Sequence, residues 1–232
     1  GSTLVGFKQV GTNAIGRTVY KKLQENVSVK DFGAIGDGIT DDTVAVQNCI
    51  NWALSNNCGV QLVGKCLITA SLIINRQVDS TSNVFRFTSA GNGQGIYVNT
   101  AITVFDSTLS FTTDPISEFI AFEGVHFESK SPTLAATLFN GKFLRMFFSD
   151  CHFEAIACLS STTYSQSWYF NNCTIRKWKN IPFFSSTGGY DLSFIGNLVE
   201  QGAAFADIVD PANTHGASGV RFLGNVIEGC VN

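Results

Sequence analysis

A nine-residue pattern that occurs five times in the second half of the chain constrains the fold more than any other feature of the sequence. Each copy contains, in order, an apolar residue, any residue, Phe, any residue, a turn residue, then Val, Cys or Asn, any residue, an apolar residue, and Glu or Arg. The copies are residues 120–128, 146–154, 168–176, 192–200 and 220–228. The Phe positions lie 26, 22, 24 and 28 residues apart, and a near-regular period of this length is typical of a solenoid.

The pattern predicts two short strands per repeat, joined by a turn rich in Gly, Asn and Asp. Successive residues of a strand point to opposite faces, so each repeat buries its apolar residues on one side. Stacking such repeats at about 4.8 Å places equivalent residues above one another, which predicts an all-β fold, the right-handed parallel β-helix. An antiparallel sandwich is the alternative fold, but its strands need not repeat in sequence.

Three columns of buried side chains are expected inside this β-helix. They are the Phe column (Phe122, Phe148, Phe170, Phe194, Phe222), a second apolar column (Phe127, Phe153, Ile175, Val199, Ile227) and a turn column (Val125, Cys151, Cys173, Asn197, Asn225). In the turn column, we expect the Asn amides to bond the backbone of their own turn and of the turn above. Residues 84–87, 102–105 and 109–111 resemble earlier, less regular coils.

Composition excludes several classes of partner. Among 232 residues, 44% are hydrophobic and the net charge is −3, and no run of Lys or Arg could follow a phosphate backbone. No apolar stretch reaches the roughly 18 residues of a membrane span, so neither nucleic acid nor membrane insertion is expected. Seven Cys occur without CxxC spacing, which predicts free buried thiols and neither a metal site nor a cofactor.

The N-terminal part of the chain carries a different signal. Residues 27–43 predict a short strand, a Gly-rich turn and then Asp or Thr residues that cap a helix. Apolar residues follow a helical period from Val46 through Cys49, Ile50 and Ala53, and Gly59 is expected to end the helix. A solenoid needs its first coil covered, and one amphipathic helix would do this.

Two stretches within this part resemble known proteins. Residues 31–34, 36–38 and 41–43 closely resemble the opening of the pectate-lyase-like β-helix family. Residues 4–7 and 14–19, leading into 22–23, are similar to the connector that joins a virion-anchoring domain to this β-helix in phage tailspikes and tail fibres. One departure is residues 63–65, Val-Gly-Lys, where the family commonly has a turn that contains Pro.

The resemblance suggests three regions. Residues 1–25 would connect to a virion-anchoring region, residues 26–75 would start the β-helix with its capping helix, and residues 76–232 would form coils that continue beyond the given sequence. The resemblance further implies a homotrimer on the virion tail, in contact with other phage tail proteins through the N-terminal region. Its ligand would be bacterial capsule or lipopolysaccharide.

Three functions are compatible with the resemblance. The first is a tailspike that binds host polysaccharide and, as the intact trimer, depolymerises it as a glycoside hydrolase or polysaccharide lyase. The second is a non-catalytic adhesin or structural segment that links the virion to a distal receptor-binding domain. The third, a secreted lyase that uses a metal ion, is disfavoured because the sequence lacks a signal peptide and an acidic Ca²⁺ site.

A column of outward side chains supplies the first catalytic candidates. This charged column comprises Glu128, Glu154, Arg176, Glu200 and Glu228. Retaining glycosidases place two carboxyl groups about 5 to 5.5 Å apart and inverting enzymes about 6.5 to 9.5 Å apart, spacings that one or two coils approximate. Stacked carboxylates raise one another's pKa, as an acid catalyst requires, so Glu154, Glu200 and Glu228 are catalytic candidates. The alternative is a purely structural role, in which Arg176 neutralises the negative charge of the stacked carboxylates.

Other candidates lie beside this column. Asp207 and Asp210, with His215, fall in the insertion 201–219, and loops on a rigid solenoid often carry function. Tyr169 and Trp178 are expected to point outward and to stack on sugar rings, with Arg176 and Lys177 meeting an acidic capsule. His126 and His152 share one column. They are interpreted as exposed spacers, and a metal or acid–base pair is the alternative.

Overall fold

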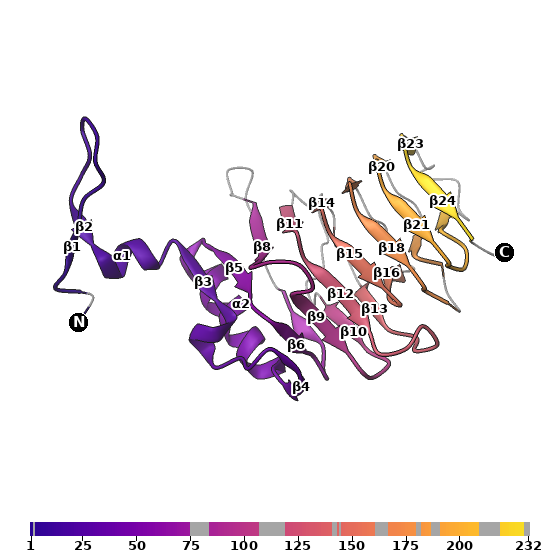
Figure 1. Cartoon of the computed structure of the whole chain (residues 1–232), viewed down its shortest axis with the longest axis horizontal. Helices are drawn as coiled ribbons and strands as arrows, with labels where there is room; N and C mark the ends of the chain where they lie inside the picture. Colours follow the sequence, from indigo (N-terminus) through magenta and orange to yellow (C-terminus); the bar gives the residue numbers. More distant parts are fainter. Residues whose placement is uncertain are drawn as a thin grey trace, which may run out of the picture.

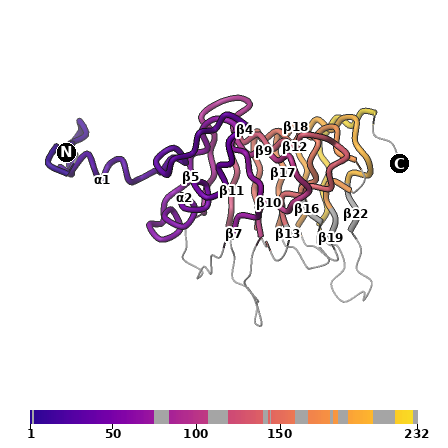
Figure 2. Tube along the Cα trace, turned by 90° about the horizontal axis from the view of Figure 1, so that it is seen from below, coloured from indigo at the N-terminus to yellow at the C-terminus, as the bar shows by residue number. Residues whose placement is uncertain are grey.

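The chain folds into a parallel β-helix whose coils follow one another along a single axis (Figure 1, Figure 2). The computed structural model describes residues 1, 3–74, 84–106, 119–140, 143, 145–160, 167–179, 182–186, 191–208 and 219–229. Three parallel sheets run the length of the stack, and each strand pairs with the equivalent strands of the neighbouring coils. The predicted solenoid is confirmed, and the antiparallel sandwich is excluded.

Each full coil contributes one strand to each sheet. The first sheet contains β3 (Asn26–Ser28), β5 (Gly59–Leu62), β8 (Phe85–Ser89), β11 (Phe119–Glu123), β14 (Arg145–Ser149), β17 (Trp168–Asn171), β20 (Leu192–Ile195) and β23 (Arg221–Leu223). The second contains β4 (Asp37–Asp41), β6 (Lys65–Leu67), β9 (Gly95–Val98), β12 (His126–Ser129), β15 (His152–Glu154), β18 (Thr174–Arg176), β21 (Leu198–Glu200) and β24 (Val226–Glu228). The third contains β7 (Leu72–Ile73), β10 (Thr103–Asp106), β13 (Thr137–Asn140), β16 (Ala157–Ser160), β19 (Phe184–Ser186) and β22 (Ala206–Ile208).

The third sheet corrects the expectation of two strands per repeat. The nine-residue pattern covers only the first two strands of each coil, because two residues join them in all five copies, as between β11 and β12. The third strand follows after gaps of different length, so it does not align between repeats. Of the earlier coils, 84–87 overlaps the start of β8 and 102–105 overlaps β10, whereas 109–111 lies outside the described residues.

The Phe column stacks in register as predicted, although its last member, Phe222, is 48% exposed. Phe122 pairs in register with Phe148, Phe148 with Phe170, Phe170 with Phe194, and Phe194 with Phe222. Ring centroids are 4.8 to 5.3 Å apart with interplanar angles of 5 to 9°. Phe87 extends the stack by one ring, 4.7 Å from Phe122. The second apolar column is also in register.

In the turn column, Cys and Asn occupy equivalent places and bond the same backbone group. Asn197 Nδ2 donates to Phe170 O at 3.0 Å and to Asn225 Oδ1 at 2.9 Å, while Asn197 Oδ1 accepts from Cys173 N at 2.9 Å. One coil earlier, the thiol of Cys173 points to Phe148 O at 3.6 Å. The predicted bonds to a neighbouring turn are confirmed, but both Asn amides bond the backbone of the preceding coil where a bond to their own turn was also expected. The buried amide of Asn197 is satisfied.

The predicted capping helix is α2 (Thr43–Asn56), which buries Val46, Cys49, Ile50 and Ala53. Its end differs from the prediction, because Asn57 adopts the left-handed conformation (φ 52°) and Gly59 already begins β5. A left-handed residue, most often Gly and sometimes Asn, is a common end of a helix.

The turn at residues 63–65 replaces the Pro-containing turn with a close backbone contact. Gly64 has a φ of 80°, and a side chain there would collide with the carbonyl oxygen of Gly36 in the coil below. Lys65 N donates to that carbonyl at 2.8 Å. Glycine is therefore required at this position for the first coils to stack.

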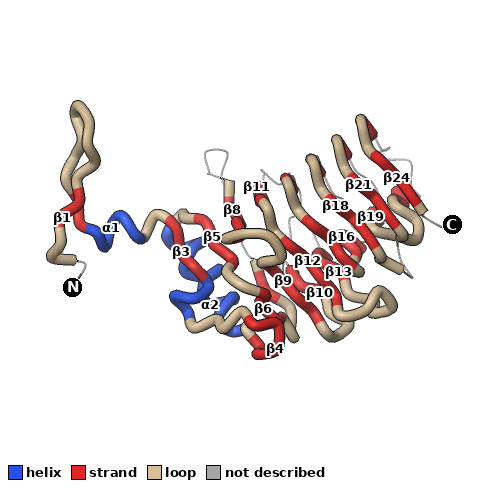
Figure 3. The backbone as a smooth tube through the Cα atoms, viewed as in Figure 1, coloured by secondary structure: helices blue, strands red, loops and turns tan. Residues whose placement is uncertain are grey.

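The first 25 residues extend away from the β-helix. Strands β1 (Gly6–Phe7) and β2 (Arg17–Thr18) pair antiparallel, and α1 (Val19–Leu23) leads towards the 3₁₀ helix η1 (Val29–Phe32) at the start of the coils (Figure 3). No residue of α1 is buried. None of the helices in the described part of the chain has the length and apolar character needed to cross a bilayer.

Candidate functional site

A polar groove of about 490 Å³ runs along the turns that join the first sheet to the second. Its lining comes from four successive coils and consists of Asn92, Gly93, Gly124, His126, Asp150, Cys151, His152, Asn172 and Thr174. Amide, carboxylate, hydroxyl and imidazole groups predominate in this lining. The groove therefore offers hydrogen-bonding partners on a rigid backbone, as the recognition of a polar ligand requires.

The backbone conformation of one turn position decides which side chains enter the groove. The left-handed residue of the turn is Gly124 (φ 67°), Asp150 (54°), Asn172 (52°), Gly196 (66°) and Gly224 (63°) in successive coils. Only two of these five residues carry a side chain, and Asn172 Nδ2 donates to Asp150 Oδ1 at 2.6 Å. Sequence analysis missed both as site residues, although the alignment of the repeats marked them as the two exceptions to Gly.

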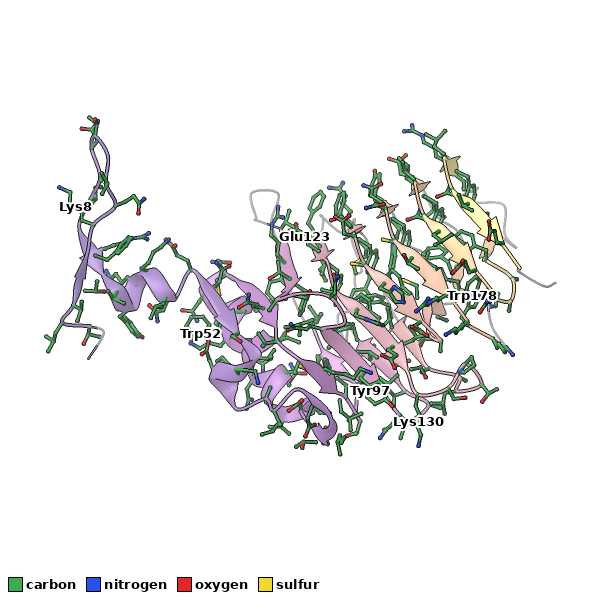
Figure 4. The ribbon with its side chains drawn as sticks, in the orientation of Figure 1. Lys8, Trp52, Tyr97, Glu123, Lys130 and Trp178 are labelled. Carbon is green, nitrogen blue, oxygen red and sulfur yellow. The ribbon has the colours of Figure 1, made fainter. Side chains whose placement is uncertain are left out.

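The charged column lies on the second sheet, next to the groove. Glu128, Glu154, Arg176, Glu200 and Glu228 pair in register along adjacent strands, as predicted. Glu128 Oε2 is 2.7 Å from Lys65 Nζ, which also lies 4.7 Å from the ring centre of Tyr97 (labelled in Figure 4). The ladder of carboxylates is thus compensated by cations at more than one level.

Glu154 is held by two cations, and this contradicts the expectation that stacking raises its pKa. Its Oε1 is 2.8 Å from Lys177 Nζ and its Oε2 is 2.9 Å from Arg176. Partial burial acts to raise the pKa of Glu154, but the hydrogen bonds from Lys177 and Arg176 outweigh it and lower the pKa to about 2. A carboxyl group with this pKa is ionised at neutral pH and has no proton to donate.

His126 and His152 are not exposed spacers. Their side chains are 19% and 27% exposed, and their ring centres are 4.4 Å apart. Burial, together with neighbouring His152, lowers the pKa of His126 to about 4. Burial and nearby Arg176 also lower the pKa of His152, whose Nε2 is 3.3 Å from Glu154 Oε2. The rings lie close together because β12 and β15 pair in register at these two residues.

The remaining catalytic candidates do not join this arrangement directly. Glu200 is half-buried beside Arg176 in the column, and Glu228 is exposed in the last described coil. The backbone of Asp207 lies in β22, where it pairs with Ser185 in the third sheet and not in the sheet of the charged column. Asp210 and His215 lie outside the described residues.

The interpretation of Trp178 as an outward residue is wrong. Trp178 (labelled in Figure 4) is 1% exposed, packs against Phe183 and donates from Nε1 to Ala204 O at 3.1 Å. Lys177 has a left-handed backbone (φ 61°) that ends the alternation of β18, so the next residue turns inward. A sugar therefore cannot stack on Trp178.

Tyr169 does face outward, in a row of aromatic rings on the first sheet. Its ring stacks on Phe147 at 4.8 Å with an interplanar angle of 6°, and Phe147 stacks on Phe119 at 5.7 Å. Most faces of these rings are covered by the next ring or by Arg145, which lies 4.8 Å from the centre of Phe119. The row therefore has few free ring faces on which a sugar could stack.

Comparison with known proteins supports the resemblance to phage proteins. The tail spike protein of Shigella phage Sf6 is 40% identical over 62 residues, which cover 27% of this chain and 10% of that protein. The tail spike protein of an Escherichia phage is 42% identical over 72 residues, 31% of this chain and 8% of that protein. The predicted similarity to phage tailspikes is confirmed.

A solved structure agrees with the fold. ORF18 of Geobacillus virus E2 superimposes on 99% of this chain and 49% of its own, with a TM-score of 0.55 and 19% sequence identity. This likeness supports the parallel β-helix alone. No protein-family model matches the chain. The matched segments span about a tenth or less of the two tail spike relatives, at 10% and 8% of their length.

Proposed function

We propose that this chain is part of a phage tailspike whose polar groove and charged column bind bacterial surface polysaccharide. The observation that carries the proposal is the groove itself, with Asp150 and Asn172 held at left-handed turns of adjacent coils. Their side chains are hydrogen-bonded to each other, so little conformational entropy is lost when a ligand binds. The identity to two tail spike proteins supports the same proposal.

The chemistry of the groove suits a saccharide. Asp150, Asn172 and Thr174 offer acceptors and donors for hydroxyl groups, and ring nitrogens of two His residues lie beside them. Lys177 is 46% exposed and Arg176 is 36% exposed, although both also contact Glu154. These two cations would attract the carboxylates or phosphates of an acidic polysaccharide.

We infer binding and not bond cleavage for the residues around Glu154. The low pKa of Glu154 leaves it without a proton to donate, and its ion pairs with Arg176 and Lys177 restrain it. If the intact trimer depolymerises its ligand, Glu200 and Glu228 are the remaining catalytic candidates of the column, with Asp207 and Asp210 as separate candidates. The non-catalytic adhesin is therefore the second candidate function.

The trimer and its attachment to the virion belong to the same proposal. Residues 1–25 extend away from the coils as a β1–β2 pair and a short helix without buried residues (Figure 3). Such an extension suits a connector that packs against other chains, because it buries little against its own β-helix. We propose phage tail proteins as the partners of this region.

Binding to a panel of purified capsular polysaccharides and lipopolysaccharides tests the proposal. D150G and N172G should each weaken binding to the recognised polysaccharide by about tenfold, since each removes hydrogen bonds to the ligand. Glycine occupies the same turn in other coils, so the backbone is preserved. K8Q, at an exposed residue of the N-terminal extension (labelled in Figure 4), serves as the control.

Two measurements, polysaccharide binding by the variants and release of oligosaccharides, test the groove and distinguish a depolymerase from an adhesin. If D150G and N172G bind as tightly as the natural chain, the groove is not the binding site. Release of oligosaccharides during incubation would identify a depolymerase, and binding without release would identify an adhesin.

A further inference from the structure

The geometry points to a site for a divalent transition-metal ion, such as Zn²⁺, held by His126, His152 and Glu154 across two adjacent coils. This inference goes beyond the proposed function, because it needs no polysaccharide. Among the described residues, these three form the one group whose potential ligand atoms all lie within 4.8 Å of one another.

The parallel register brings the three ligands together. His126 lies directly opposite His152 in the pairing of β12 with β15, and Glu154 is two residues beyond His152 on the same face of the strand. Zn²⁺ bonds to His and carboxylate are about 2.0–2.2 Å, which places ligand atoms of a tetrahedral site about 3.4 Å apart. His152 Nε2 and Glu154 Oε2 are already 3.3 Å apart.

An unsatisfied nitrogen supports the site independently. His126 Nε2 is buried and has no hydrogen-bond partner in the structure. It lies 3.7 Å from Glu128 Oε2, beyond hydrogen-bonding distance. A buried polar atom without a partner is costly, and a metal ion bound to this nitrogen would remove that cost.

The ligand set selects the class of ion. Two imidazoles and one carboxylate suit Zn²⁺, Ni²⁺, Co²⁺ or Cu²⁺, whereas Ca²⁺ and Mg²⁺ prefer oxygen ligands. Three protein ligands leave a fourth position open to water or to an oxygen of another molecule. Because both His side chains line the polar groove, that position would face the groove.

Two neighbouring cationic side chains compete with the metal ion for the carboxylate of Glu154. Arg176 and Lys177 both contact Glu154, so a bound metal would have to share its carboxylate or displace Arg176 from Oε2. We therefore expect moderate affinity. Removing the positive charge of Arg176 should tighten metal binding, because the ion would no longer be repelled.

Calorimetric titration of the tag-free chain with Zn²⁺, after treatment with a chelator, tests the inference. We expect one ion per chain, with H126Q and H152Q each weakening binding by about tenfold or more. E154Q should behave likewise, and R176Q should bind about tenfold more tightly. H215Q is the matched control, because it removes the one other His of the chain.

Substitution with Co²⁺ adds a readout of the ligands. The site is supported by a visible absorption spectrum typical of Co²⁺ with few ligands that disappears in H126Q. A thiolate charge-transfer band would instead assign the ion to Cys and overturn the proposed site. The inference is also overturned if Zn²⁺ fails to saturate one site, if H215Q loses binding as H126Q does, or if R176Q binds more weakly. If E128Q, and not E154Q, loses binding, Glu154 is not the ligand. Circular dichroism of each variant checks that the fold is retained.

Discussion

The N-terminal region, residues 26–74, and the later coils, residues 119–229, share one stacked backbone and one apolar core but hold their turns by different chemistry. In the N-terminal region, carboxylates hold the turns. Asp42 is 2% exposed and accepts from Ile35 N at 2.7 Å and Gly36 N at 2.9 Å. In the later coils, columns of apolar side chains hold the stack, and the turns are bonded through Asn and Cys.

This difference explains why the two regions carry such different sequence signals. A turn held by carboxylates needs particular residues at fixed short distances, and it therefore yields a recognisable motif. An apolar column needs only a residue of the right kind once per coil, and it becomes visible only when the repeats are aligned. Substitutions in each region should therefore affect stability through different interactions.

The largest effect is expected at the centre of the Phe column. F148A should lower the free energy of unfolding by about 3–5 kcal/mol, because it opens a cavity among tightly packed rings. Phe148 is 1% exposed and stacks on Phe122 and Phe170. Urea-induced unfolding followed by circular dichroism measures the loss. F222A alters the same column where the ring is 48% exposed, so it should lower the free energy of unfolding by clearly less than F148A does. If the two variants lose equal stability, burial within the column is not the source of the stability.

The second effect concerns the carboxylate-held turns. D42A leaves two backbone N–H groups without an acceptor, and we expect a loss of about 2–4 kcal/mol in the same unfolding experiment. Q61A, at an exposed residue of β5, should change stability by less than about 0.5 kcal/mol. A D42A protein as stable as Q61A would show that these hydrogen bonds do not hold the first coils.

The third effect tests whether Cys can replace Asn in the turn column. N197A removes the bonds to Cys173 N and Phe170 O and should cost about 1–3 kcal/mol. N197C restores a weak donor to the same carbonyl, as Cys173 does one coil earlier, so its thermal midpoint should lie between those of N197A and the natural chain. A midpoint at or below that of N197A would disprove the equivalence of the two residues.

The smallest effect is a pH dependence at the start of α2. Hydrogen bonds from Thr43 and Thr69 lower the pKa of Asp41 below its usual value. The ionised carboxyl therefore stabilises the fold above about pH 4, and this contribution is lost as the pH falls through the lowered pKa. D41N should be about 0.5 kcal/mol less stable at pH 7, since the exposed carboxyl is screened by solvent. The difference between the two proteins should shrink in unfolding curves recorded at about pH 2 to 3.

The sequence predicted the features that depend on the first two strands of each coil, whose spacing is constant. The Phe column, the turn column and the charged column follow from two strands separated by two residues in every repeat, so they could be read from spacing alone. The third strand could not, because gaps of two to seven residues precede it in the later coils. The orientation of Trp178 was predicted wrongly for a related reason. Lys177 adopts a left-handed conformation that interrupts the alternation of the strand, and a lysine does not predict this conformation.

The charges of the site were the least predictable part. The sequence placed Glu154 next to Arg176, but it could not show that Lys177 reaches the same carboxylate and that the pKa falls. The alignment of His126 with His152 was also predicted, whereas their burial was not. Burial depends on how closely the turns of adjacent coils pack, and this is a property of the assembled stack.

The left-handed turns between the first two sheets limit what variation the groove can accept. Gly, Asn and Asp are the residues that tolerate this conformation readily, and they are the three found there. This one turn position can therefore present three kinds of chemistry to the groove: no side chain, an amide or a carboxylate. Further diversity in the lining must come from the outward positions of the second strands, where His126, His152 and Thr174 already contribute side chains.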